Sequence, residues 1–223
     1  MTQQKILLLN GSPRKKGTSF SFARTIKILT EKQGHEGDII HIIDYFNQKK
    51  DFSDLKVIIP QYDIIGLITP LYVDTLPYPV IWFLEELTWQ ASDLLRNKRF
   101  FALGQCGFPN VKLCESLLES CRFFAEETEM KWLGGLGYGG GSIIDGALLE
   151  NLGKKGEKIT HAFQIALDDL FADRKISFQV QELLTVNIPP ILYTPLAAFL
   201  NFRAKQNAQK FGVKDLSRKF YLE

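Results

Sequence analysis

The sequence has few of the residues that metal centres and disulfide frameworks require. It contains three histidines and three cysteines among 223 residues. Cys106, Cys114 and Cys121 lie too far apart for a C-x-x-C motif, and their odd number does not suit a set of disulfides. The histidines have neither metal-ligand spacing nor a companion nucleophile. These absences argue against a metal site and against a Ser-His-Asp hydrolase, and we predict no catalytic side chain.

Strong net charge and long uninterrupted apolar runs are also lacking. The formal net charge is only +2, which does not by itself indicate nucleic-acid binding. Residues 186–200 are strongly apolar, but three prolines interrupt them and they are too few to span a bilayer. Residues 1–5 lead straight into an apolar run, so we expect no signal or transit peptide. The sequence therefore predicts a cytoplasmic protein without a nucleic-acid partner.

The C-terminal segment differs in charge from the rest of the chain. Residues 201–223 carry six basic and two acidic side chains. Such a segment is usually a solvated helix face. A docking surface for NADPH, for an acidic partner or for an anionic membrane is the alternative, and interfacial membrane contact is the less favoured of the readings.

Strand and helix patterns alternate through the first two thirds of the chain. Aliphatic runs such as residues 64–68 are continuous, as expected for strands that helices cover on both faces. The expected strands are 5–10, 38–43, 63–69, 99–105 and 131–138, and the expected helices are 18–33, 77–90, 110–128 and 151–173. This alternation predicts a three-layer α/β/α fold around a five-stranded parallel sheet.

The turn after the first strand has the composition of an anion site. Residues 10–19 read Asn-Gly-Ser-Pro-Arg-Lys-Lys-Gly-Thr-Ser, and Thr18 or Ser19 is expected to cap the helix that follows. A helix N-terminus attracts anions, and Arg14 can add charged donors. The segment matches neither the P-loop nor the dinucleotide-binding glycine motif. An ordinary capped turn with exposed basic residues is the alternative.

The same turn resembles the phosphate-binding loop of a known family. Gly11-Ser12-Pro13-Arg14 followed by Gly17-Thr18-Ser19 is similar to the GSPR…GNT loop of the flavodoxin-like NADPH-dependent FMN reductases, with Thr18 in place of Asn and Ser19 in place of Thr. The resemblance implies a flavodoxin-like sheet in the order 2-1-3-4-5 and a bound FMN. The residues it assigns to the FMN phosphate are Ser12, Arg14, Gly17, Thr18 and Ser19.

Two further loops complete the resemblance. Residues 70–77 match the family's P-x-Y-x(4)-P segment, which implies that Pro70, Leu71, Tyr72 and Val73 lie beside the flavin ring. A half-buried core position is the alternative for Tyr72. Just beyond this segment, relatives have a Lys and an Asp-Arg pair where this chain has Ile81, Glu85 and Glu86.

The third loop follows the fourth expected strand. Its residues Gln105, Cys106 and Gly107 are expected to approach the ring closely, with Cys106 as a small neighbour rather than a redox thiol. The glycine-rich residues 134–141 are expected to form a tight turn after strand five, with gating of the flavin face as the alternative.

The resemblance implies an FMN-dependent oxidoreductase. NAD(P)H would reduce the flavin, which would then reduce a small-molecule acceptor such as a flavin, a quinone, a nitro or azo compound or a ferric chelate. We expect residues 1–173 to form the FMN-binding domain, and residues 174–223 to form an extension that packs on this domain or on the second subunit of a homodimer. A flavodoxin-type electron carrier without NAD(P)H activity, and a non-catalytic interaction module, are the alternatives.

Overall fold

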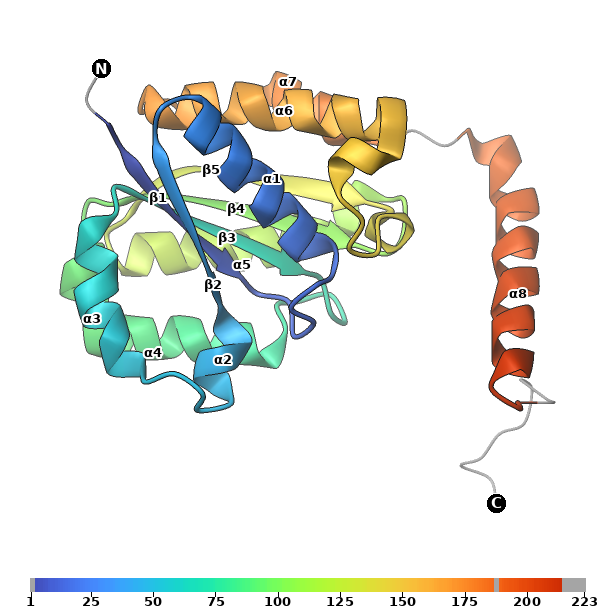
Figure 1. Ribbon diagram of the computed structural model, residues 1–223, viewed down its shortest axis with the longest axis horizontal. Helices are drawn as coiled ribbons and strands as arrows, with labels where there is room; N and C mark the ends of the chain where they lie inside the picture. Colours follow the sequence, from blue (N-terminus) through green and yellow to red (C-terminus); the bar gives the residue numbers. More distant parts are fainter. Residues whose placement is uncertain (1–2, 187–188, 214–223) are drawn as a thin grey trace. The chain divides into compact units, whose positions relative to one another are not determined.

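A parallel sheet of five strands, in the order β2-β1-β3-β4-β5, forms the centre of the protein in the computed structural model (Figure 1). The structure describes residues 3–186 and 189–213. The strands are β1 (Lys5–Asn10), β2 (Glu36–His41), β3 (Ile64–Pro70), β4 (Arg99–Cys106) and β5 (Lys131–Gly139). The predicted flavodoxin-like strand order is confirmed.

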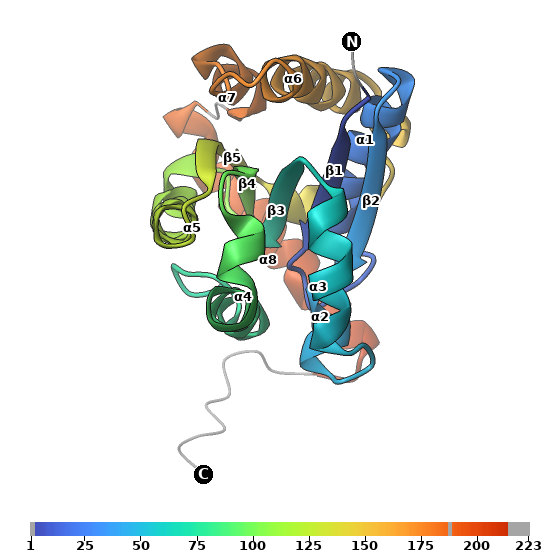
Figure 2. The ribbon, with the colours of Figure 1, turned by 90° about the vertical axis from the view of Figure 1, so that its left-hand side faces the viewer.

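Helices cover both faces of this sheet (Figure 2). The helices are α1 (Thr18–Lys32), α2 (Ile42–Phe46), α3 (Leu55–Ile58), α4 (Tyr78–Leu95), α5 (Glu115–Glu127), α6 (Gly153–Phe171), α7 (Phe178–Leu184) and α8 (Tyr193–Lys210). The predicted helix over residues 110–128 begins as a 3₁₀ turn at Val111–Cys114 and continues as α5. α1 and α6 pack on one face of the sheet, and α4 and α5 pack on the other.

Alternate side chains of the central strands supply two separate cores. Leu8 points toward Phe22 and Phe163, under α1 and α6, whereas Leu7 lies in the core formed with α4 and α5. Gly66 in β3 permits a close contact, because a Cβ added there would lie 2.3 Å from Cε1 of the Phe101 ring. Continuous apolar strands therefore reflect burial on both faces, as the sequence predicts.

The compact unit extends beyond the predicted boundary at residue 173. It runs from Met1 to Val186 and includes α7. Val180 and Leu184 of α7 are fully buried, and the backbone N–H of Ile176 donates to the carbonyl oxygen of Leu133 (2.8 Å). Residues 174–186 are thus part of the domain, because their apolar side chains complete its core.

The remaining residues, Asn187–Glu223, form a second unit. Its described part contains a 3₁₀ turn, Pro190–Leu192, and α8. Residues 187–188 and 214–223 of the predicted extension lie outside the described residues. Among residues 3–186 and 189–213, none of the helices combines the length and the apolar character needed to cross a membrane.

Candidate functional site

Backbone hydrogen bonds join the loops at the carboxyl ends of the strands. The N–H of Gly11 donates to the carbonyl oxygen of Ile68 (2.9 Å). The N–H of Leu71 donates to the carbonyl oxygen of Gln105 (2.8 Å). The loops after β1, β3 and β4 therefore meet at one edge of the sheet, beside the point where the winding direction reverses. In open α/β sheets this is where ligands bind.

Short-range hydrogen bonds fix the shape of the first loop. The N–H of Ser12 donates to Oδ1 of the buried Asn10 (3.2 Å), and the N–H of Arg14 donates to Oγ of Ser12 (3.2 Å). Gly11 allows the loop to lie against β3, because a Cβ there would come within 2.7 Å of Oγ1 of Thr69. The loop is thus held in a single tight turn that leads into α1.

The N-terminus of α1 has no side-chain cap. The N-cap residue is Gly17, so the expectation that Thr18 or Ser19 caps this helix is wrong. Both residues already lie in the helix, and their hydroxyls point to other loops: Oγ1 of Thr18 donates to the carbonyl oxygen of Gly141 (2.7 Å), and Oγ of Ser19 lies 3.5 Å from Nε2 of Gln105. The N–H groups of the first helical turn therefore remain available to an anion.

Arg14 lies exposed above this helix terminus. Its side chain is 71% exposed, and its only ion pair among the described residues is with Asp145, at 3.3 Å. Both side chains of this pair are solvated, so the pair contributes little to stability. The guanidinium can therefore turn toward an anion at the start of α1 at little cost.

Lys15 is held by a buried carboxylate, although its position in the loop suggested a solvated side chain. Nζ of Lys15 lies 2.5 Å from Oδ1 of Asp44, which is buried at α2. Burial by itself would raise the pKa of Asp44, but the hydrogen bond and charge of Lys15 outweigh burial and hold that pKa below its ordinary value. Lys15 therefore anchors the first loop to α2.

We expect Lys15→Ala to lower the free energy of unfolding by about 1–2 kcal/mol at pH 7, because Asp44 loses the cation that compensates its burial. Since the folded-state pKa of Asp44 is depressed, the stabilisation is present above the ordinary pKa and disappears as the pH falls through the folded-state value. Urea unfolding at several pH values should show the two proteins converging below about pH 4. Lys16→Ala, at an exposed position of the same loop, is the control. An unchanged stability of Lys15→Ala at pH 7 would contradict the anchoring role.

The second loop presents a strained and exposed tip. The N–H groups of Tyr72 and Thr75 each donate to the other's carbonyl oxygen (2.9 and 3.1 Å), and the two residues between them have left-handed φ angles, +47° at Val73 and +60° at Asp74. A β-branched residue rarely adopts this conformation. Val73 is 95% exposed and Tyr72 is 46% exposed, so Tyr72 is not one of the buried core residues.

The third loop is linked to the loop after β5. Oγ of Ser142 donates to the carbonyl oxygen of Gly107 (3.1 Å), and the thiol of the buried Cys106 lies 3.2 Å from the carbonyl oxygen of Phe108. Cys106 has a neighbouring thiol that the sequence did not reveal. Burial, and then the proximity of Cys106, raises the pKa of Cys114 to about 12. Cys114 therefore remains protonated, and no feature of the pair indicates thiolate chemistry.

The loop after β5 also lies at this edge of the sheet, and the sequence indicated only its glycine-rich start, residues 134–141, as a possible part of the site. β5 continues through the glycine-rich run to Gly139, and the chain turns at Gly140, where φ is +80°. Gly146, with φ +83°, packs directly on the first loop, since a Cβ there would lie 2.1 Å from the carbonyl oxygen of Lys16. The Asp145-Gly146 dipeptide is a turn signal, but it does not indicate which loop the turn contacts.

The site combines anion donors with exposed apolar side chains. The unpaired N–H groups of α1 and the guanidinium of Arg14 suit a phosphate. Large apolar residues on the neighbouring loops are exposed, namely Tyr72, Val73, Tyr78, Phe108 and Ile143. A flat, mostly apolar ring with a phosphate at one end fits this arrangement, so the residues present suit FMN. Ten of the twelve predicted site residues lie on the loops described above or at the ends of the adjoining strands, and the other two, Thr18 and Ser19, begin α1.

A parallel sheet in this order, with a tight first loop and an uncapped helix N-terminus at its switch point, defines a flavodoxin-like fold. The family model of the NADPH-dependent FMN reductases matches residues 4–124, more than half of the chain. The chain therefore belongs to this family of FMN-dependent oxidoreductases, whose cofactor is FMN.

Solved structures with this fold share little sequence with the chain. The Trp repressor binding protein from Bacillus subtilis is 16% identical with a TM-score of 0.55, over 71% of this chain and 98% of its own. A flavone reductase is 13% identical with a TM-score of 0.50, over 75% of this chain and 64% of its own. No curated protein matches the sequence. At these identities the structural similarity establishes the fold alone.

Proposed function

We propose that the protein oxidises NAD(P)H through a bound FMN and passes the electrons to a second, small-molecule acceptor. Flavins, quinones, nitro and azo compounds and ferric chelates are the acceptor classes. When bound, FMN supplies the redox chemistry. The observation that carries the proposal is the uncapped N-terminus of α1 with the exposed Arg14 above it, in a chain that belongs to a flavin reductase family.

In this proposal the chain's own residues bind and orient the cofactor. The first loop would bind the phosphate through the N–H groups at Thr18 and Ser19 and through Arg14. Ser12 and Gly17 would keep the turn in shape, since Oγ of Ser12 accepts from the N–H of Arg14 and the N–H of Gly17 donates to the carbonyl oxygen of Arg14 (3.3 Å). The second and third loops would line the ring, with Pro70 to Val73 on one side and Gln105 to Gly107 on the other. No acid–base pair is required, because the cofactor itself accepts the hydride. A cytoplasmic location is part of the proposal, and the three free cysteines suit a reducing compartment.

We expect FMN to bind at least tenfold more tightly than riboflavin. Only FMN has the phosphate that the first loop would hold, and each charged hydrogen bond contributes about 1.5–3 kcal/mol. Titration of the flavin-free protein, followed by flavin fluorescence, measures both affinities. Equal affinities would refute the assignment of the first loop to the phosphate.

Oxidation of NADPH and NADH separates the reductase from an electron carrier. With FMN bound and a quinone or free flavin as acceptor, we expect steady-state loss of absorbance at 340 nm as NAD(P)H is consumed. A flavodoxin-type carrier would bind FMN but leave both nicotinamides unoxidised. The sequence pI near 8.3 favours the reductase, because electron-carrying flavodoxins are typically acidic.

A further inference from the structure

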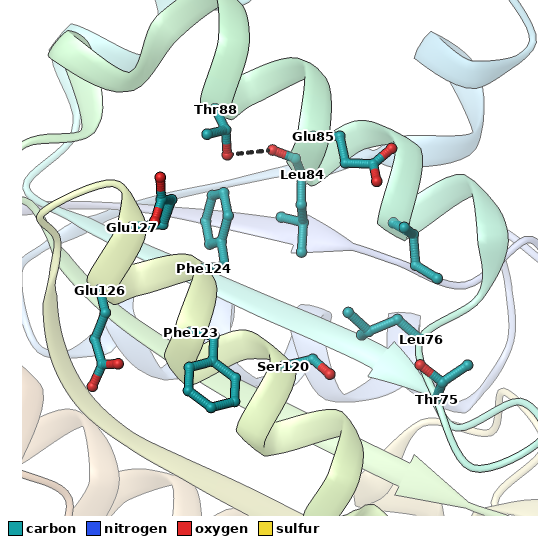
Figure 3. A pocket seen from close by; sticks show the side chains of 11 residues that line it. Thr75, Leu76, Leu84, Glu85, Thr88, Ser120, Phe123, Phe124, Glu126 and Glu127 are labelled. Carbon is teal, nitrogen blue, oxygen red and sulfur yellow. Dashed lines mark hydrogen bonds between the residues drawn. The ribbon is translucent and has the colours of Figure 1, made fainter.

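An open groove separates α4 from α5, on the face of the sheet opposite α1 and α6. It has a volume of about 640 Å³, and Figure 3 shows side chains of both helices lining it. Its apolar lining consists of Leu76, Ile81, Leu84, Phe123 and Phe124. Phe123 is 56% exposed, although it is large and apolar. Leu76 and Leu84 are buried at its base, so the groove is an apolar hollow with an exposed aromatic side chain, which suits a docked apolar partner.

Carboxylates surround this groove. α4 carries three acidic residues and no basic one, and α5 carries four acidic residues and a single Arg122. Arg122 is already paired with Glu119 at 2.5 Å and with Glu126. Glu85 and Glu127 line the groove without an ion pair among the described residues. The groove therefore suits an apolar and basic occupant.

α8 has these two properties. It carries Arg203, Lys205 and Lys210, and residues 189–213 contain no acidic side chain. One stripe of the helix consists of Tyr193, Ala197, Leu200 and Ala204, at intervals of four, three and four residues, and Phe211 follows the last residue of the helix. Tyr193, Leu200 and Phe211 are exposed. The alanines between these large side chains would let α8 lie close to another helix.

We propose that α8 of one copy of the chain lies in the α4–α5 groove of a second copy. A reciprocal exchange would cover two grooves and two helices in one symmetric dimer. α8 has 18 residues, so at 1.5 Å per residue it extends about 27 Å, which is longer than the part of α4 that lines the groove, from Ile81 to Thr88. The predicted homodimer would then have a defined interface, in which α8 of the C-terminal unit fills the groove of the partner.

Such an interface would adjoin the second loop. Thr75 and Leu76 line the groove, and Thr75 closes the strained turn that begins at Tyr72. Oγ of Ser116 in α5 also donates to the carbonyl oxygen of Asp74 (2.5 Å). A helix seated in the groove would thus contact the base of the loop that we assign to the flavin ring.

Cysteine cross-linking tests which chain supplies the helix. Phe123→Cys places a thiol in the groove and Leu200→Cys places one on α8, while the three native cysteines are buried. Mixed full-length single variants should form a disulfide-linked dimer on mild oxidation, and neither variant alone should do so. Gln164→Cys, in the separate groove beside α6, replaces Phe123→Cys as the control and should give no cross-link with Leu200→Cys. A chain that carries both substitutions serves as a further test. The proposal would be overturned if the cross-link formed only within this chain, or if no cross-link formed at all.

Charge reversal tests the electrostatic match in solution. We expect Glu85→Lys with Glu127→Lys, or Arg203→Glu with Lys205→Glu, to weaken dimerisation at least tenfold in sedimentation velocity, and we expect all four together to restore it. The control pair, Glu150→Lys with Glu157→Lys, changes charge beside the other groove and should leave the dimer intact. Binding to phosphatidylglycerol vesicles tests the alternative that α8 contacts an anionic membrane. The proposal fails if reversal on α8 abolishes vesicle binding while the association state is unchanged, since α8 would then be a membrane contact.

Discussion

A chain that ends at Asp173 is expected to lose about 3–6 kcal/mol of its free energy of unfolding. It lacks α7, whose Val180 and Leu184 are fully buried against the core formed with α6 and β5. Burial of each such side chain contributes about 1.5–3 kcal/mol. The side-chain amide of Gln181, which bonds both the N–H and the carbonyl oxygen of Gly137, is lost as well. A domain of this size has a total stability of about 5–15 kcal/mol, so this loss is a large fraction of it, and the truncated protein should unfold at a much lower urea concentration and aggregate more readily.

A chain that ends at Val186 is the matched control. It keeps α7 and the whole compact unit, and it lacks only the second unit. We expect it to remain soluble, to unfold cooperatively in urea and to bind FMN with the affinity of the full chain. Circular dichroism and urea unfolding of the two truncated proteins make the comparison. If the shorter protein matched the longer one in stability, α7 would not be part of the core, contrary to its burial.

The residues of α7 illustrate what the sequence could not predict. The strands were predictable to within two residues at each end, because apolar runs, such as residues 6–9 in β1, indicate strands buried on both faces. α7 has only seven residues, and α2 and α3 have fewer. Helices this short show too few turns for a hydrophobic period to be recognised, and they depend on tertiary packing for their stability. Their existence therefore follows from contacts and not from local pattern.

The same distinction holds for the site. The loops after β1, β3 and β4 were predictable, since each has local motif residues at the end of an apolar strand. The residues that these loops contact elsewhere in the chain were not predictable. Lys15 meets Asp44 29 positions away, and Thr18 meets Gly141 123 positions away, so no local motif records either pair. Thr18 and Ser19 have the composition of capping residues, but tertiary hydrogen bonds use their hydroxyls instead.

Arg14→Ala is expected to weaken FMN binding ten- to a hundredfold, which corresponds to about 1.5–3 kcal/mol. Arg14 carries the single guanidinium of the loop that leads into the uncapped N-terminus of α1, and its existing ion pair with Asp145 is long and solvated. Replacing it should therefore change the free energy of unfolding by less than about 0.5 kcal/mol while removing a strong phosphate contact. Titration with FMN and urea unfolding of the same preparation separate the two effects.

At saturating FMN, the rate of NAD(P)H oxidation should stay near that of the unaltered protein. A phosphate contact is the same in the ground state and the transition state, so its loss lowers affinity without slowing the chemical step. Lys16→Ala should leave FMN affinity nearly unchanged. Asp145→Ala should leave it unchanged or slightly raised, because Arg14 then has no competing carboxylate. Intact FMN affinity in Arg14→Ala, together with a large loss in Lys16→Ala, would mean that Lys16 and not Arg14 holds the phosphate.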